Sequence, residues 1–292
     1  RPPRSTLFPY TTLFRSPLWR RYPLLLVALL LLALPTLWSL ASLLWGKSDQ
    51  EHGPILLLMF AWVLHREWPR LDALPEQPSR WGWALVLPAL LAYVLGRSQQ
   101  IWLLEIGAFI PLLAGCGVLA KGRAALRPLA FPLLMLLFAI PLPGALVDLL
   151  TTGLKQHVSV LAENLLYGAG YPIARSGVTL TIGSYQLLVA DACSGLNSLF
   201  SLFAVGLLYL YMQGYHSRWR NLLLLLAIAP IAILANVVRV MALVLLTYYG
   251  GDALGQGFLH GVAGILLFAI ALLALYLLDA ALGVLFRTRR PS

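Results

Sequence analysis

The sequence predicts an all-α integral membrane protein with about eight transmembrane helices, and with a small amphipathic helix and a β-hairpin on the outer side before the sixth span. Of its 292 residues 60% are hydrophobic and only 11% are charged, whereas a soluble domain carries about 25% charged residues. Lipid must therefore solvate much of the chain, which requires helices or a closed barrel. Long uninterrupted runs of Leu, Ala, Val and Ile, without period-two alternation, favour helices.

Eight apolar segments are candidate spans, because a hydrocarbon core about 30 Å thick requires roughly 20 helical residues. They are residues 22–45, 53–64, 81–95, 101–120, 126–146, 194–213, 221–249 and 258–286. The second and third segments are short, so we use the charges of the flanking loops to decide whether they cross the membrane.

The loop charges support all eight spans. With the N-terminus in the cytoplasm, 16 of the 21 Lys and Arg residues fall in inside segments, four fall in outside segments, and Arg239 lies within a span. Omitting the second span would invert every later loop and remove this asymmetry. We therefore expect both termini inside. The net charge of +10 is then explained by loops that face anionic membrane lipids, and nucleic acid is not an expected partner.

The N-terminal residues look foreign to the fold. Residues 8–16 read Phe-Pro-Tyr-Thr-Thr-Leu-Phe-Arg-Ser, which looks like the translation of a sequencing-library adapter. No apolar period or helix cap runs through them, so we expect residues 1–16 to be an assembly artefact and residues 17–292 to form the transmembrane domain. The alternative is a genuine basic cytoplasmic tail.

The longest segment between spans, residues 144–191, is assigned to the outside. Leu and Val recur at helical spacing across residues 146–167 with charged residues between them, which favours an amphipathic helix at the membrane interface. Alternating apolar and polar residues around Gly183 and Ser184 then predict a hairpin that leads to Cys193. Its free edge suits strand addition by an extended peptide, and a cap that only orders the loop fits the pattern equally well.

Three polar residues stand out in or beside the last three spans. Cys193 begins the sixth span, where the helix dipole favours a thiolate. Arg239 lies in the seventh span, about 15 Å from its outer end, and His260 opens the eighth. Ionisable residues inside a membrane are functional candidates by default, and the predicted topology places all three in the outer half.

Three neighbours are candidate supporting residues. Gly195 allows close approach of another backbone, Asn197 shares a helical face with Cys193, and Asn236 shares one with Arg239.

Other polar residues in the spans have simpler interpretations. Cys116 is expected to be an apolar filler, about 22 Å deeper than Cys193, and so too far away for a disulfide, which requires Cα atoms within roughly 7 Å. Glu105 is expected to snorkel or to hydrogen-bond a neighbour, and His260 alone would fit an interfacial histidine. Arg239 is harder to dismiss, because a buried guanidinium is costly without an anionic partner.

Three short motifs surround Cys193, Arg239 and His260: Ala-Cys-Ser-Gly-Leu at 192–196, Asn-Val-Val-Arg-Val at 236–240 and Gly-Phe-Leu-His-Gly at 257–261. In these motifs the chain resembles the exosortase family of membrane thiol transpeptidase-like proteases. The chain length and the Gly-Gln-Gly-Phe-Leu-His-Gly stretch at 255–261 look closest to the exosortase B subgroup. The resemblance implies that Cys193 is the nucleophile and that Arg239 and His260 are essential.

The resemblance also implies a substrate class and a location. The expected partners are exported proteins with a C-terminal sorting signal, which consists of a Pro-Glu-Pro motif, a membrane span and a basic tail. Processing would pass through a thioester acyl-enzyme in the bacterial inner membrane, with the active site on the periplasmic side, in systems linked to exopolysaccharide and biofilm. No cofactor and no metal are expected, and the oligomeric state is left open.

Two other classes of function remain open. A polytopic transporter or glycan-export component would use Arg239 as an intramembrane anion site without covalent chemistry, although the sequence shows none of the internal repeats that favour a transporter. A membrane scaffold in polysaccharide export would tolerate the loss of the Cys193 thiol.

Overall fold

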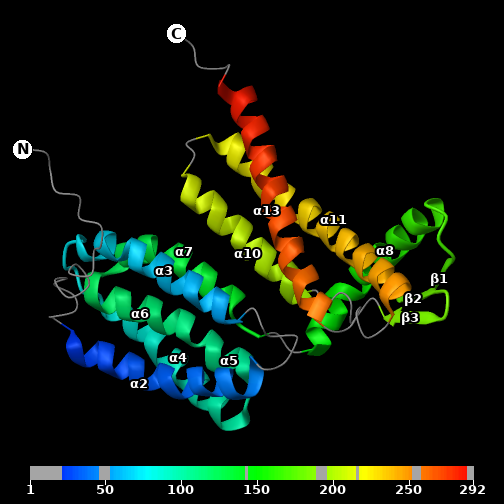
Figure 1. Ribbon diagram of the computed structural model, residues 1–292. Coiled ribbons are helices and arrows are strands. Elements are labelled where there is room, and N and C mark those ends of the chain that lie inside the picture. Colours follow the sequence, from blue (N-terminus) through cyan, green and yellow to red (C-terminus); the bar gives the residue numbers. More distant parts are fainter. Residues whose placement is uncertain are drawn as a thin grey trace, which may run out of the picture. The chain divides into compact units, whose positions relative to one another are not determined.

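The computed structural model describes residues 22–45, 53–141, 144–188, 196–214, 217–251 and 258–287, and several side chains within these ranges, including those at 196–200 and 258–268, are not described. The residues expected to be an artefact, 1–16, lie outside the described part. The chain divides into two compact units, Arg1–Leu142 and Pro143–Ser292. The described part of the first unit is helical, and the second combines long helices with a small sheet (Figure 1).

The first unit is a bundle of apolar helices. Helix α2 continues directly into a π-helical turn, η1, and α5 is separated from α6 by the single residue Ala108. The elements are α2 (Pro23–Ser39), η1 (Leu40–Leu44), α3 (Gly53–Asp72), η2 (Arg80–Gly82), α4 (Trp83–Gln99), α5 (Trp102–Gly107), α6 (Phe109–Lys121), η3 (Arg123–Ala125) and α7 (Leu126–Phe138).

The second unit begins with a long helix and a sheet and ends with three long helices. Its elements are α8 (Gly144–Gly168), β1 (Ile173–Ser176), β2 (Thr179–Ile182), β3 (Tyr185–Leu188), α10 (Leu196–Gln213), α11 (Arg218–Gly250) and α13 (Phe258–Arg287). Helices α10, α11 and α13 pack against one another, and the strands lie beside α8 and the C-terminal end of α11 (Figure 1).

Several helices are suited to a bilayer. Within the described ranges, four helical segments are long and apolar enough to cross a membrane: Pro23–Leu44, Arg80–Gln99, Trp102–Lys121 and Trp219–Gly250. Large apolar side chains point away from the protein, and Leu24, for example, is 83% exposed. Lipid is the solvent that such a surface requires. A multi-pass helical membrane protein is therefore confirmed, and the count of eight spans stays a prediction.

Helix α3 shows why the second predicted span looked too short. The apolar run ends at residue 64, but the helix continues for two more turns to Asp72. Its buried stripe also continues, because Glu67 and Leu71 lie on the face that carries Leu56 and Val63. Lys121 then caps the end of α3, since its Nζ donates to the carbonyls of Asp72 and Leu74 at 3.0 Å. The segment 53–64 is thus the apolar part of a 20-residue helix.

The fifth predicted span, residues 126–146, is wrong at its C-terminal end. Helix α7 ends at Phe138, and Pro141 follows after a short turn. Proline has no N–H to donate and disfavours helical geometry in the residue before it. A continuous hydrophobic run therefore masked a helix end, and a separate helix, α8, begins at Gly144.

The sheet confirms the predicted hairpin and adds one strand. Strands β2 and β3 are antiparallel, pairing Ile182 with Tyr185 across a two-residue turn at Gly183, whose φ is +57°. Glycine adopts this left-handed conformation without the strain of a Cβ. Strand β1 pairs with the other side of β2. Strand β1 was not predicted, because only its first residue, Ile173, is buried and its apolar alternation is therefore weak.

The core of the second unit joins the sheet to two helices. Buried residues from α8 (Val158, Ala162 and Leu166), from the strands (Ile173, Leu180, Ile182 and Leu187) and from α11 (Val237, Val240, Leu243 and Val244) form one cluster. Each fully buried Val, Leu or Ile side chain contributes about 1.5–3 kcal/mol to the stability of the fold. We call α8 together with the three strands the cap, because it packs on the half of α11 that contains Arg239.

Candidate functional site

The candidate site residues differ in how far the structure describes them. Arg239 and Asn236 lie in α11 with described side chains. Asn197 lies in the first turn of α10 and His260 in the first turn of α13, and the side chains of both are outside the described residues. Cys193 and Gly195 lie outside the described residues altogether. What the structure brings together is the three helices that carry or adjoin the candidates.

Arg239 is held in the protein interior and does not face lipid. Its residue is 6% exposed, and Asn236, one turn earlier on the same face, is 2% exposed. The flanking residues Val237 and Val240 are buried in the core that joins α11 to the cap. A charged side chain deep in a membrane helix is expensive and is retained where it serves a pathway or a site.

The cap connects Arg239 to the predicted nucleophile along the chain. Strand β3 ends at Leu188, five residues before Cys193. The buried Leu187 of that strand packs in the same core as Val237 and Val240 of α11. The chain therefore leaves the cap for Cys193 from a strand that is fixed against the Arg239 segment.

Tyrosines gather where α11 ends beside the cap. The Tyr171, Tyr248 and Tyr249 rings meet edge-on, with centroids 5.0–6.3 Å apart. The hydroxyls of Tyr171 and Tyr249 are 3.2 Å apart. Amphipathic rings of this kind are typical of the membrane–water boundary. The end of α11 near Arg239 thus has the composition of an interfacial region.

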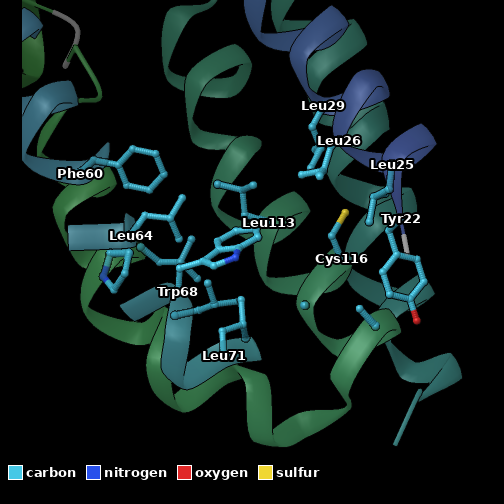
Figure 2. A pocket seen from close by; sticks show the side chains of 15 residues that line it. Tyr22, Leu25, Leu26, Leu29, Phe60, Leu64, Trp68, Leu71, Leu113 and Cys116 are labelled. Carbon is cyan, nitrogen blue, oxygen red and sulfur yellow. The ribbon is translucent and has the colours of Figure 1, made fainter. Parts of the chain in front are cut away.

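Cys116 occupies an apolar setting that is unsuited to acyl transfer. It is a free, buried cysteine, and it lines a cavity of about 150 Å³ in the first unit together with Leu25, Leu64 and Trp68 (Figure 2). Apart from Cys116 itself, the labelled side chains that carry a polar group are Tyr22 and Trp68. The lining contains no acid, histidine or cationic residue that would activate a thiol. This environment agrees with the expectation that Cys116 is a packing residue.

Glu105 makes hydrogen bonds, as one of the two sequence interpretations expected. It is 1% exposed, and its Oε1 accepts from Thr36 Oγ1 at 2.7 Å and from Arg97 Nη1 at 2.8 Å. Arg97 also donates to Ser39 Oγ at 3.0 Å. The network ties α2, α4 and α5 together. Across the described residues, no group of three His, Cys, Asp or Glu converges as metal ligands would.

A second buried ion pair was missed by the sequence analysis. Asp279 of α13 is 4% exposed and accepts hydrogen bonds from Tyr209 of α10 and Arg220 of α11. The available signal was an aspartate within an otherwise apolar final span, which is as unusual as the arginine at 239.

These features define a class: a multi-pass helical membrane protein whose second unit buries an arginine in a helix that packs against a small cap. Residues 44–277 match the family model described as transmembrane exosortase (Exosortase_EpsH). The match covers well over half of the 292 residues, and the chain belongs to this family. Membership implies a membrane enzyme of the peptidase or transpeptidase kind that processes proteins bearing sorting signals.

Neither the curated proteins nor the solved structures include a match to this chain.

Proposed function

We propose that the chain is a thiol peptidase or transpeptidase that cleaves the C-terminal sorting signal of exported proteins through a thioester acyl-enzyme. The observation that carries the proposal is the buried Arg239 and Asn236 pair, on a helix that packs against both the cap and the helices next to Cys193 and His260. Family membership supplies the substrate class, a protein with a sorting signal.

The reaction begins at Cys193. Its thiolate sulfur bonds to the carbonyl carbon of the scissile peptide, giving a tetrahedral oxyanion. The C–N bond then breaks, and the proton held by the His260 imidazolium passes to the leaving amine. Water or an acceptor amine attacks the resulting thioester, transfers its proton to the neutral His260, and restores the Cys193 thiolate.

Arg239 supplies fixed positive charge close to this chemistry. A guanidinium in a water-poor interior stabilises a thiolate or an oxyanion more strongly than it would in bulk water, and it has no need to reorganise as the charge develops. The same group suits a carboxylate, so the glutamate of a Pro-Glu-Pro motif is an alternative ligand. Asn236, Asn197 and Gly195 are proposed to support the arrangement.

The cap is proposed to receive the substrate before the cut. Strand β3 is an edge of the described sheet, so an extended peptide beside it would gain main-chain hydrogen bonds by strand addition. The chain runs on from that strand to Cys193 within five residues.

The cellular setting follows from the same proposal. We place the enzyme in the bacterial inner membrane with eight spans, both termini in the cytoplasm and the active site on the periplasmic side. The chain length and the Gly-Gln-Gly-Phe-Leu-His-Gly stretch at 255–261 support the exosortase B subgroup, and exopolysaccharide export is the expected context.

Coexpression with a tailed substrate tests the proposal. A secreted reporter that carries a Pro-Glu-Pro motif, a membrane span and a basic tail is expressed with the wild type or with Cys193→Ala. The wild type is expected to release the tail, and the Cys193→Ala variant to leave it intact at equal protein level. Equal cleavage by both would reject Cys193 as the nucleophile, and would favour a transporter or scaffold for this chain.

A further inference from the structure

The buried pair in the second unit joins the three long helices at one point. Arg220 of α11 donates from Nε and Nη2 to Asp279 Oδ1 of α13 at 2.9 and 2.6 Å. The Tyr209 hydroxyl of α10 donates to Asp279 Oδ2 at 2.6 Å. Both carboxylate oxygens of Asp279 are therefore engaged, each by a different helix. We call these three residues the clamp.

The site is built around this contact. Asp279 is 4% exposed and lies inside the apolar stretch Ala269–Val284. Arg220 Nη2 also donates to the Asp279 main-chain oxygen at 3.1 Å. One turn further along α13, Gly283 leaves room for the guanidinium, because a Cβ there would lie 3.2 Å from Arg220 Nη2. A buried pair of this kind contributes little net stability and is best attested as a device that specifies register.

The packing above the clamp follows the register that it sets. Helices α11 and α13 run in opposite directions, so equal steps from the ion pair lead to the same level. Leu224 and Leu275, each four residues from the pair, share one buried cluster. Ile228 and Ala271, each eight residues from the pair, line one small cavity. Within about two turns of the ion pair, the two helices therefore pack side by side.

Extending the same register reaches the candidate catalytic residues. Arg239 lies 19 residues after Arg220, and His260 lies 19 residues before Asp279. At 1.5 Å per residue, both are about 28 Å from the clamp. Both steps stay within continuous helices, α11 and α13. On two antiparallel helices, equal spacing from the clamp predicts similar levels for the backbones of Arg239 and His260.

Helix α10 begins on the same side of the clamp. Tyr209 lies 13 residues after Leu196, the first residue of α10, which is about 20 Å along the helix. Cys193 is three residues before Leu196 in the chain and lies outside the described residues. The clamp therefore lies near the end of α10 that is far from the chain leading to Cys193.

We propose that Tyr209, Arg220 and Asp279 are positioning residues, which fix the axial register of α10, α11 and α13 and so align the helix that follows Cys193 with the segments that carry Arg239 and His260. The inference rests on the proposed function. A slip of one helix by a single turn, about 5.4 Å, removes the alignment of Arg239 with His260. Misplacement of catalytic groups by about 1 Å can cost about 10²-fold in rate.

Kinetics of clamp variants test this role. We expect Asp279→Asn and Tyr209→Phe to lower kcat for tail cleavage by about 10-fold to 10²-fold with little change in KM, because the cap that receives substrate is untouched. Asp279→Glu keeps the charge and is expected to recover part of the rate. The matched control is Glu105→Gln, which also removes a buried carboxylate charge beside an arginine but lies in the first unit.

A cross-link reports the register without activity. In a chain with Cys116→Ala and Cys193→Ala, the pair Ala232→Cys and Ala271→Cys joins α11 to α13 at residues that share a buried cluster. Oxidation with iodine is expected to join the two buried thiols in a disulfide, and Asp279→Asn or Tyr209→Phe to reduce the yield. Because this chain is inactive by design, its result stands whether or not Cys193 is the nucleophile.

Two results would overturn the positioning role: unchanged kcat and unchanged cross-linking in both clamp variants, or an equal loss of kcat in Glu105→Gln. If Asp279→Asn fails to fold, the kcat and the cross-linking yield of Tyr209→Phe test the positioning role, since this substitution removes a single hydroxyl. Cleavage that survives Cys193→Ala would instead reject the proposed function. The cross-linking yield would still report whether the clamp fixes the register of α11 and α13.

Discussion

Arg239 is the residue where sequence and structure meet most closely. The sequence singles it out because arginine is rare within an apolar span, and the structure shows it buried beside Asn236 at the junction of α11 and the cap. Its value to the protein depends on geometry as well as charge, because only a guanidinium offers a planar fork of donors to an oxyanion or a carboxylate.

Arg239→Lys is therefore expected to lose most activity even though the charge is kept. We predict a fall in kcat/KM for tail cleavage of about 10²-fold, the size found when a donor to an oxyanion is removed. The matched control is Arg175→Lys, since Arg175 forms a partly exposed ion pair with Glu163 at 2.8 Å, and exposed pairs contribute about 0–1 kcal/mol. If Arg239→Lys behaves like Arg175→Lys, fork geometry plays no part in the reaction.

Residues also show where prediction from sequence stops. Arg239 and Glu105 could be recognised as unusual because each is a charge in an apolar run. The partners Arg97 and Thr36 of Glu105, and the partners of Asp279, could not, because they come from other helices. Periodicity within one helix carries no information on which helix lies opposite.

Among the elements, the cap carries the clearest consequence for substrate binding. In a two-residue hairpin the hydrogen-bonded pairs alternate from the turn, so Tyr185 and Leu187 bond to β2 while the N–H groups of Gln186 and Leu188 point to the free edge. Gln186 is exposed. Its N–H can thus be removed without loss of pairing between β2 and β3.

Gln186→Pro tests strand addition directly, because proline deletes that N–H. We predict a rise in KM for a tailed substrate of about fivefold to tenfold, the effect of losing one hydrogen bond of about 1 kcal/mol or slightly more. Gln186→Ala, which keeps the N–H, should leave KM near the wild-type value. A KM that is equally unaffected by both substitutions would show that substrate does not pair with β3.

Prediction of the elements from sequence succeeded where periodicity and turn chemistry agreed. The hairpin turn at Gly183 and the helix ending near Gly168 were both anticipated. The errors arose at the ends of apolar segments: α3 extends past residue 64 because tertiary burial of Glu67 and Leu71 sustains it, and α7 stops early because of Pro141. Hydropathy alone measures transfer into lipid and not the continuity of the backbone.

At the scale of the molecule, the two units differ in what they contribute: the candidate site lies in the second unit, and the first consists of apolar helices. All six candidate site residues fall in Pro143–Ser292, together with the cap and the clamp. The first unit provides apolar helices, and hydrogen bonds to Glu105 connect α2, α4 and α5. In the part of the chain that the structure describes, four segments are long and apolar enough to be spans, so the eight-span arrangement rests on the distribution of loop charge.

Labelling of single cysteines checks that arrangement. In a Cys116→Ala and Cys193→Ala background, the exposed positions Gln77, Ser98 and Ser176 are replaced one at a time by cysteine. An impermeant maleimide applied to spheroplasts is expected to label positions 98 and 176 at once, and position 77 only after permeabilisation. Labelling of position 77 in intact spheroplasts would contradict eight spans with both termini inside.

The most direct measurement is the mass of the enzyme trapped with its substrate. The wild type is incubated with the tailed reporter, quenched in acid, digested and examined by mass spectrometry. The account predicts a substrate-derived acyl group on the peptide that contains Cys193, linked by a thioester that hydroxylamine removes. Turnover of substrate by the wild type with no adduct on Cys193 under any quench, and undiminished turnover in Cys193→Ala, would contradict it.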